Sequence, residues 1–133
     1  MGREFSQPMI LGIGSDLAEV ARIRASRERF GDRFLHRVYT DAEIAYALSK
    51  ANADERFAAR FAAKEAGMKA LGTGLSQGVT WRDFAVGREP GGRPTIVLSG
   101  AAARIAAQRG VKRTHITITH TAELAMAVVI MED

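Results

Sequence analysis

The sequence predicts a single α+β domain in which an antiparallel sheet packs on one long central helix. A chain of 133 residues suits one compact domain with its own core. Its middle third has the apolar spacing of a helix, and several apolar runs on either side are short enough for strands. No internal repeat, low-complexity tract or interdomain linker divides the chain.

The central helix is expected to run through residues 57–71. At about 100° per residue, one arc of this segment collects the large apolar side chains, which are Phe57, Phe61, Met68 and Leu71. Gly72 follows directly, in the position that glycine favours just past a helix end. The arc therefore predicts the buried face of a core helix.

Two features of this helix break the plain amphipathic pattern. Lys64 projects inside the apolar arc, and Glu65 and Lys69, one turn apart, stand side by side at its border. One interpretation is a snorkelling lysine beside an ordinary surface ion pair. The other is a functional site, and this interpretation gains weight because a second acidic residue, Asp16, also stands in an unusual place.

A short buried strand is expected over residues 9–13, and it runs into the sequence GIGSD at residues 12–16. The glycines invite comparison with a dinucleotide-binding loop, but Leu17 stands where that pattern needs its third glycine. Asp16 is therefore either the N-cap of a helix that starts near Leu17 or a free carboxylate at the mouth of a core strand.

Residues 19–38 are expected to be helical, with Gly31-Asp32 as the place where an interruption would fall. If the helix is continuous, a second face carries the arginines Arg22, Arg29, Arg33 and Arg37. Because like charges repel, such a row does not stabilise the helix. It is either a solvated face or a docking surface for an acidic partner.

The other elements follow from shorter signals. Thr40 and Glu43 form a capping box, which predicts a short helix to about Leu48. The remaining expected elements are an irregular strand over 79–87 with Trp81 and Phe84 in the core, a strand over 95–98, a helix over 100–109 capped by Ser99, and strands over 115–119 and 124–131. Residues 1–8 are expected to be an extension outside the domain, which we place at residues 9–133.

Composition narrows the function. A net charge of +4 and a pI near 10.0 favour an acidic partner, such as a nucleic acid, a phosphorylated ligand or an acidic protein. Aromatic residues are sparse and are not interleaved with basic ones, which weakens the single-stranded nucleic-acid interpretation. The lack of cysteine excludes disulfides and thiolate metal sites and is compatible with the cytoplasm. No apolar run is long enough to predict a membrane span.

The candidate ligands are those of a hard cation. Asp16 at a strand end and Glu65 in a helix suit Mg²⁺, which keeps waters and takes further oxygen ligands from phosphate. The basic residues Arg60, Lys64 and Lys69 would then surround that phosphate. His120 is either a solvated loop residue or a phosphate contact.

Two stretches of this sequence resemble motifs of the holo-acyl-carrier-protein synthases, the single-length type of 4′-phosphopantetheinyl transferase. Residues 12–17, with Arg22 six positions after Asp16, are similar to the opening motif of that family. Residues 60–66, followed by Lys69 and residues 72–74, are similar to its central signature, which is highly specific.

A third stretch, residues 116–121, resembles the last motif of the family, with Thr117 and Thr119 in place of the usual serines. The resemblance covers residues 9–132, with all three motifs in order. It implies the 4′-phosphopantetheinyl transferase-like fold and a cytoplasmic enzyme of fatty acid biosynthesis. Such an enzyme uses Mg²⁺ to transfer phosphopantetheine from coenzyme A to a serine of apo acyl carrier protein, releasing 3′,5′-ADP.

The resemblance also assigns roles to residues of this chain. Asp16, Glu65 and Lys69 would be catalytic, the first two as metal ligands. The coenzyme A contacts would be Arg60, Lys64, Lys69, Gly72, His120 and Thr121, and the carrier-protein contacts would be Arg22 and Arg29. It further implies a homotrimer that binds coenzyme A between subunits, and no nucleic-acid or membrane partner.

Two alternatives stay open at this point. The first is a coenzyme A- or nucleotide-binding module without catalysis, which would bind coenzyme A tightly but transfer nothing. The second is a small basic RNA-binding protein, whose affinity would fall steeply with salt.

Overall fold

The computed structural model describes residues 7–133, so most of the expected extension over residues 1–8 lies outside the described residues. In chain order, the elements are β1 (Ile10–Glu19), α1 (Val20–Phe30), α2 (Asp32–Val38), α3 (Asp41–Leu48), α4 (Ala53–Leu71), a 3₁₀ turn (Trp81–Asp83), β2 (Phe84–Arg88), β3 (Pro94–Leu98), α5 (Gly100–Gln108), β4 (Arg113–His120) and β5 (Leu124–Glu132). This is the expected α+β arrangement, with α4 as the long central helix.

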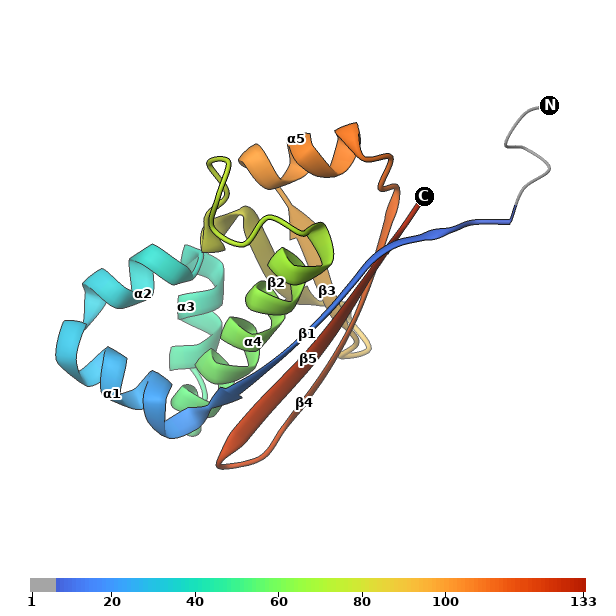
Figure 1. Cartoon of the computed structure of the whole chain (residues 1–133). Coiled ribbons are helices and arrows are strands. Elements are labelled where there is room, and N and C mark those ends of the chain that lie inside the picture. Colours follow the sequence, from blue (N-terminus) through green and yellow to red (C-terminus); the bar gives the residue numbers. More distant parts are fainter. Residues whose placement is uncertain (1–6) are drawn as a thin grey trace.

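The main sheet is antiparallel, and α4 crosses one of its faces while α1, α2 and α3 lie beyond the helix (Figure 1). The strand order is β1-β5-β4, so β5 is the central strand. Residues of β5 that face α4 are fully buried, and two of them, Ala125 and Ala127, are small. Buried alanines of α4, among them Ala62 and Ala66, let the helix approach the sheet closely.

Strand β1 lies directly against the backbone of α4, and the glycines of β1 permit this contact. A Cβ atom added at Gly12 would overlap the carbonyl oxygen of Ala70, and one added at Gly14 would overlap that of Ala66. These two glycines therefore serve close packing of strand on helix rather than a phosphate-binding turn.

Strand β1 is longer than expected, and this corrects one interpretation of Asp16. Pairing with β5 continues without a break from Gly12–Met131 to Glu19–Leu124, so Asp16 lies inside the strand, opposite Ala127. It therefore does not cap a helix. Helix α1 starts at Val20, and Glu19 precedes it without a side-chain capping bond.

The segment expected to be helical over residues 19–38 is interrupted at the predicted place. Gly31 has a φ of 55°, a value that favours glycine, and it separates α1 from α2. The arginine row is therefore divided, with Arg22 and Arg29 on α1 and Arg33 and Arg37 on α2. The capping box at the start of α3 is confirmed, since Thr40 and Glu43 exchange both bonds.

The second sheet is the hairpin of β2 and β3, and it begins later than expected. Trp81 lies in the 3₁₀ turn before β2 and is only half-buried, whereas Phe84 is fully buried, as predicted. Ser99 makes no capping bond to α5; the carboxylate of Asp83 instead accepts a hydrogen bond of 3.2 Å from Ala102 N. Within residues 7–133, no helix has the length and apolar content needed to cross a membrane.

We predict that Gly14→Ala lowers the free energy of unfolding by about 1–3 kcal/mol, because the added methyl group forces β1 away from α4. Gly91→Ala is the matched control, since a Cβ atom at Gly91 meets nothing within 4 Å. Chemical denaturation of both variants measures the difference. Equal stability of the two variants would show that the close contact is not needed.

Candidate active site

Asp16 and Lys69 meet across the contact between β1 and α4. Lys69 Nζ lies 3.1 Å from Asp16 Oδ1 and donates a second hydrogen bond, of 2.9 Å, to the carbonyl oxygen of Ser15. Glu65, one turn before Lys69 on α4, lines the same cleft as Asp16. The structure thus brings together the three residues predicted to be catalytic.

Electrostatic repulsion couples the two carboxylates. The pKa of the Glu65 carboxyl is raised above its ordinary value of 4.5, first by burial and next by the negative charge of Asp16. The indole of Trp81 and the ammonium of Lys69 act in the opposite direction. Under these conditions, the free energy of the site falls when Glu65 takes up a proton or when the two carboxylates share a cation.

A cleft of about 330 Å³ opens beside the two carboxylates. Its walls include Arg22 of α1, Phe34 of α2 and Phe61 of α4. This volume is near the lower end of the range for small-molecule sites. The cleft combines a cation, a carboxylate pair and an apolar wall, so it suits a ligand with both charged and apolar parts.

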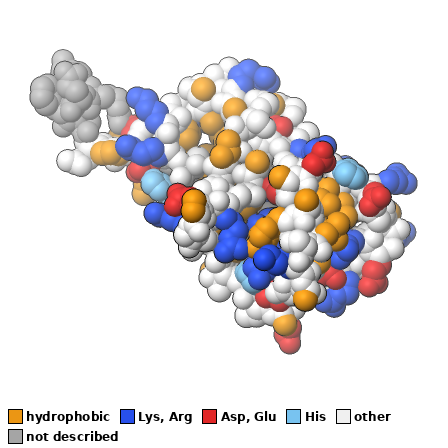
Figure 2. Space-filling model, turned by 180° about the vertical axis from the view of Figure 1, so that it is seen from behind, with side chains coloured by type: hydrophobic (Ala, Val, Ile, Leu, Met, Phe, Trp, Pro, Cys, Tyr) orange, Lys and Arg blue, Asp and Glu red, His pale blue; other side chains and the backbone are white. Residues whose placement is uncertain are grey.

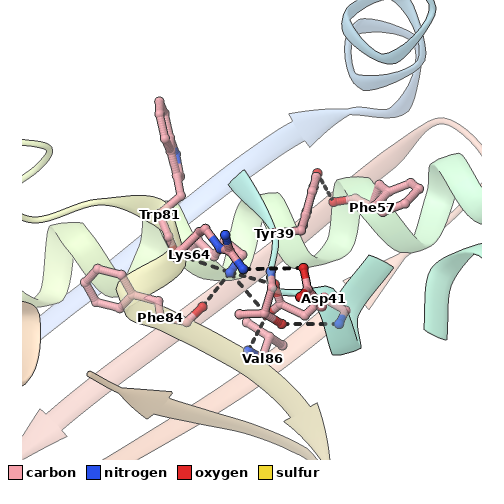
Figure 3. Close-up of polar contacts among 10 residues, drawn as sticks. Tyr39, Asp41, Phe57, Lys64, Trp81, Phe84 and Val86 are labelled. Atoms are coloured by element: carbon pink, nitrogen blue, oxygen red, sulfur yellow. Dashed lines mark hydrogen bonds and ion pairs between the residues drawn. The ribbon is translucent and has the colours of Figure 1, made fainter. Parts of the chain in front are cut away.

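Lys64 lies elsewhere, and its position corrects the prediction that it contacts coenzyme A. Its side chain is 0 % exposed, and its amino group lies 2.8 Å from Glu43 Oε1. The same amino group donates hydrogen bonds to the carbonyl oxygens of Trp81 (3.2 Å) and Phe84 (2.6 Å), as Figure 3 shows. An ammonium with these partners and no exposed surface cannot reach a ligand.

Glu43 is the partner that sequence reasoning missed. Its sequence signal was only that of a capping residue, but its carboxylate also accepts a hydrogen bond of 2.6 Å from Val86 N. It therefore ties α3 to α4 through Lys64 and to β2 through the backbone. Burial lowers the pKa of Lys64, and the charge of Glu43 opposes this change.

A second pocket contains Arg60 and His120, and it shares no lining residue with the first cleft. Two further basic residues, Arg56 and Arg88, also line it. His120 Nδ1 lies 2.6 Å from Glu55 Oε1, which fixes the orientation of the imidazole. Sequence reasoning missed Arg56 and Arg88, because neither belongs to a recognisable motif. Basic side chains are also grouped near the middle of the face seen in Figure 2.

Arg60 is buried, but not all of its polar atoms are used. Its guanidinium lies 4.4 Å from the centre of the Tyr46 ring, and burial lowers its pKa. Among residues 7–133, its buried Nε has no hydrogen-bond partner. A buried, incompletely paired guanidinium in a basic pocket is well suited to bind an anion.

The remaining predicted contacts lie outside both of these pockets. Gly72 ends α4 with a φ of 84°, as predicted for a C-terminal glycine. Thr121 Oγ1 accepts hydrogen bonds from the N–H groups of Glu123 and Leu124 and thereby shapes the turn between β4 and β5. Arg29 is exposed on α1, where its guanidinium lies 5.1 Å from the centre of the Phe30 ring.

We predict that the Glu65 pKa in metal-free protein lies above 4.5, as its burial requires. Asp16→Asn should lower that pKa because it removes a negative charge, and Lys69→Met should raise it because it removes a positive one. A ¹³C NMR titration of the side-chain carboxyls measures these shifts. A Glu65 pKa that does not fall in Asp16→Asn would contradict the proposed coupling of the two carboxylates.

Comparison with known proteins gives one consistent result. The profile of the 4′-phosphopantetheinyl transferase superfamily matches residues 12–129. The holo-[acyl-carrier-protein] synthase of Koribacter versatilis is 64 % identical over 125 residues, which make up 94 % of this chain and 100 % of that protein.

Solved structures agree with this match. The synthase of Neisseria meningitidis superposes with a TM-score of 0.86 at 30 % identity, covering 94 % of this chain and 100 % of the other. The synthase of Helicobacter pylori in complex with coenzyme A superposes with a TM-score of 0.79 at 31 % identity, covering 90 % and 98 %. The chain belongs to the 4′-phosphopantetheinyl transferase superfamily, among the holo-[acyl-carrier-protein] synthases.

Proposed function

We propose that this chain transfers 4′-phosphopantetheine from coenzyme A to a serine of an apo acyl carrier protein, in the cytoplasm and for fatty acid biosynthesis. The observation that carries the proposal is that Asp16 and Glu65 line one cleft and that Lys69 bonds to Asp16. The relatives support it, since they are holo-[acyl-carrier-protein] synthases and one solved structure contains coenzyme A.

In the proposed reaction, the serine oxygen forms a bond to the β-phosphorus of coenzyme A. The bond between that phosphorus and the bridging oxygen breaks, and 3′,5′-ADP leaves. Glu65 accepts the serine proton through a water molecule rather than directly, because a carboxylate that also held Mg²⁺ would be a weakened base. Lys69, one turn further on, stabilises or protonates the leaving phosphate.

Asp16 and Glu65 would hold Mg²⁺. Within residues 7–133, no group of three or more His, Cys, Asp and Glu side chains could hold a metal, so a cation here depends on water and phosphate for its other ligands. Mg²⁺ is commonly bound in this way. When bound, it would neutralise charge on the pyrophosphate, and the repulsion between the two carboxylates gives the site affinity for a cation.

The basic pocket of Arg60 and His120 is the proposed site for the phosphates of the ADP portion. Because this pocket and the carboxylate cleft have no lining residue in common, we propose that one coenzyme A molecule uses the cleft of one chain and the pocket of another. Contacts from Gly72 and Thr121 remain predictions from the family resemblance.

The outer face of the main sheet supports an oligomer, which we propose to be a homotrimer. This face is opposite α4, and its exposed apolar side chains include Ile13 (63 %), Leu17 (62 %) and Met126 (44 %). Leu17 lies directly opposite Met126, so their side chains share one face and form a continuous patch. Exposed apolar patches of this kind mark protein interfaces. The number three comes from the family resemblance.

The carrier protein is proposed to dock on α1. Arg22 lines the cleft beside the two carboxylates, and Arg29 is exposed about two turns along the same helix. An acidic partner held by these arginines would present its serine to the cleft. An acidic carrier protein would account for the net positive charge of the chain without a nucleic-acid partner.

The transfer reaction tests the proposed function. Asp16→Ala or Glu65→Ala should lower the rate of transfer on the order of a hundredfold or more, because each removes charge stabilisation from the transition state. Mass spectrometry of the apo carrier protein after incubation with coenzyme A and Mg²⁺ measures the product. Near-native turnover by either variant at saturating Mg²⁺ would exclude that residue from the site.

Docking predicts a selective effect. Arg22→Glu should raise the apparent KM for the carrier protein and change coenzyme A binding less, and the effect should shrink at high salt, where charges are screened beyond about 8–10 Å. Steady-state kinetics at two salt concentrations measure both parameters. Equal losses for both substrates would place Arg22 in the catalytic step or in folding instead.

A mixing experiment tests the shared site. Asp16→Ala and His120→Ala should each be inactive alone but regain activity when mixed and allowed to exchange subunits. Asp16→Ala mixed with Glu65→Ala is the control and should stay inactive, because both residues line one cleft. Failure of the first mixture to recover, or a fully active monomer in light scattering, would refute the shared site.

A further inference from the structure

We infer that Trp81 is a positioning residue for the transfer reaction, and that its indole N–H orients the Glu65 carboxylate in the cleft. This inference rests on the proposed role of Glu65. Trp81 would not touch the substrate; it would act through the carboxylate.

The first observation is an unused donor beside the site. The buried Nε1 of Trp81 has no hydrogen-bond partner among residues 7–133, although an unpaired buried donor lowers the stability of a protein. The indole stacks on Phe61, which lies one turn before Glu65 on α4, so the indole lies beside the part of α4 that carries Glu65. In the inferred arrangement, the carboxylate of Glu65 accepts a hydrogen bond from the free Nε1–H.

The second observation is that the neighbours of Trp81 fix its orientation. Lys64 Nζ donates to the carbonyl oxygen of Trp81 at 3.2 Å, and the indole points away from that bond (Figure 3). The Phe61 ring, one turn before Glu65, stacks on the indole with 6.4 Å between centroids. The Arg37 guanidinium lies 5.6 Å from the indole ring. Lys64 thus fixes the backbone of Trp81, and Phe61 and Arg37 restrict the orientation of its ring.

This arrangement gives the buried Lys64 a role in the site, although its amino group cannot reach the ligand. It anchors the turn that carries Trp81, and Trp81 in turn restricts the rotation of Glu65. Groups that orient a metal-binding carboxylate in this way are worth roughly 10–100-fold in metal affinity or activity.

The test compares Trp81→Phe with wild type. The variant keeps a ring for Phe61 to contact and loses the N–H. It should bind Mn²⁺, a spectroscopic substitute for Mg²⁺, roughly 10–100-fold more weakly, as measured by electron paramagnetic resonance. Its kcat should fall in parallel, and its KM for the carrier protein should not change.

Because Trp81 is the only tryptophan of the chain, global replacement by an analogue changes this residue alone. Benzothienylalanine keeps the indole shape but has sulfur in place of N–H, so it should reproduce the loss even if Trp81→Phe folds poorly. 4-Fluorotryptophan keeps the N–H and should behave as wild type.

Wild-type Mn²⁺ affinity in the benzothienylalanine protein would overturn the inference. The variant Glu65→Ala distinguishes a failure of the role inferred for Trp81 from a failure of the proposed function. If Glu65→Ala loses Mn²⁺ binding and the benzothienylalanine protein does not, only the role of Trp81 is wrong. If Glu65→Ala also binds Mn²⁺ normally, the proposed metal site is wrong as well.

Discussion

The contact between β1 and α4 is the constraint on which the rest of the structure depends. Gly12 and Gly14 let the strand lie directly against the helix backbone at Ala66 and Ala70. Only at this separation can Asp16, two residues beyond Gly14, bond to Lys69 and repel Glu65. Larger residues in place of the glycines would separate the carboxylates, so the same contact that packs the core also assembles the site.

Consecutive residues of α4 divide the work of folding and chemistry. Lys64 turns inward to the buried carboxylate of Glu43, which joins α3, α4 and β2. Glu65 turns toward the cleft. Removing one partner of a buried ion pair destabilises a protein. Substitutions of Lys64 should therefore lower activity by destabilising the fold. In the proposed account, the turn at Trp81 connects the buried Lys64 with Glu65 in the cleft.

Much of the fold and of the candidate site could be predicted from the sequence. The end of α4 at Gly72 and the capping box of α3 depend on local spacing, and both were confirmed. Of the predicted apolar arc, Phe57, Met68 and Leu71 are buried, whereas Phe61 is only partly buried because it lines the cleft. The length of β1 could not be predicted from the sequence, because it depends on pairing with a strand more than 100 residues away. The buried state of Lys64 was also hidden, because it requires a carboxylate from another helix. Motif reasoning identified Asp16 and Glu65 in the cleft and Arg60 and His120 in the basic pocket, but it missed Arg56 and Arg88 and could not show that the two sites are separate.

The most direct test of the central claim, that the cleft and the basic pocket serve one ligand from two chains, is a crystal structure with coenzyme A and Mg²⁺. We predict the pyrophosphate beside Asp16 and Glu65 of one subunit, and the 3′-phosphate of the same molecule against Arg60 and His120 of a neighbour. A coenzyme A molecule bound wholly within one chain, or away from Asp16 and Glu65, would contradict the account.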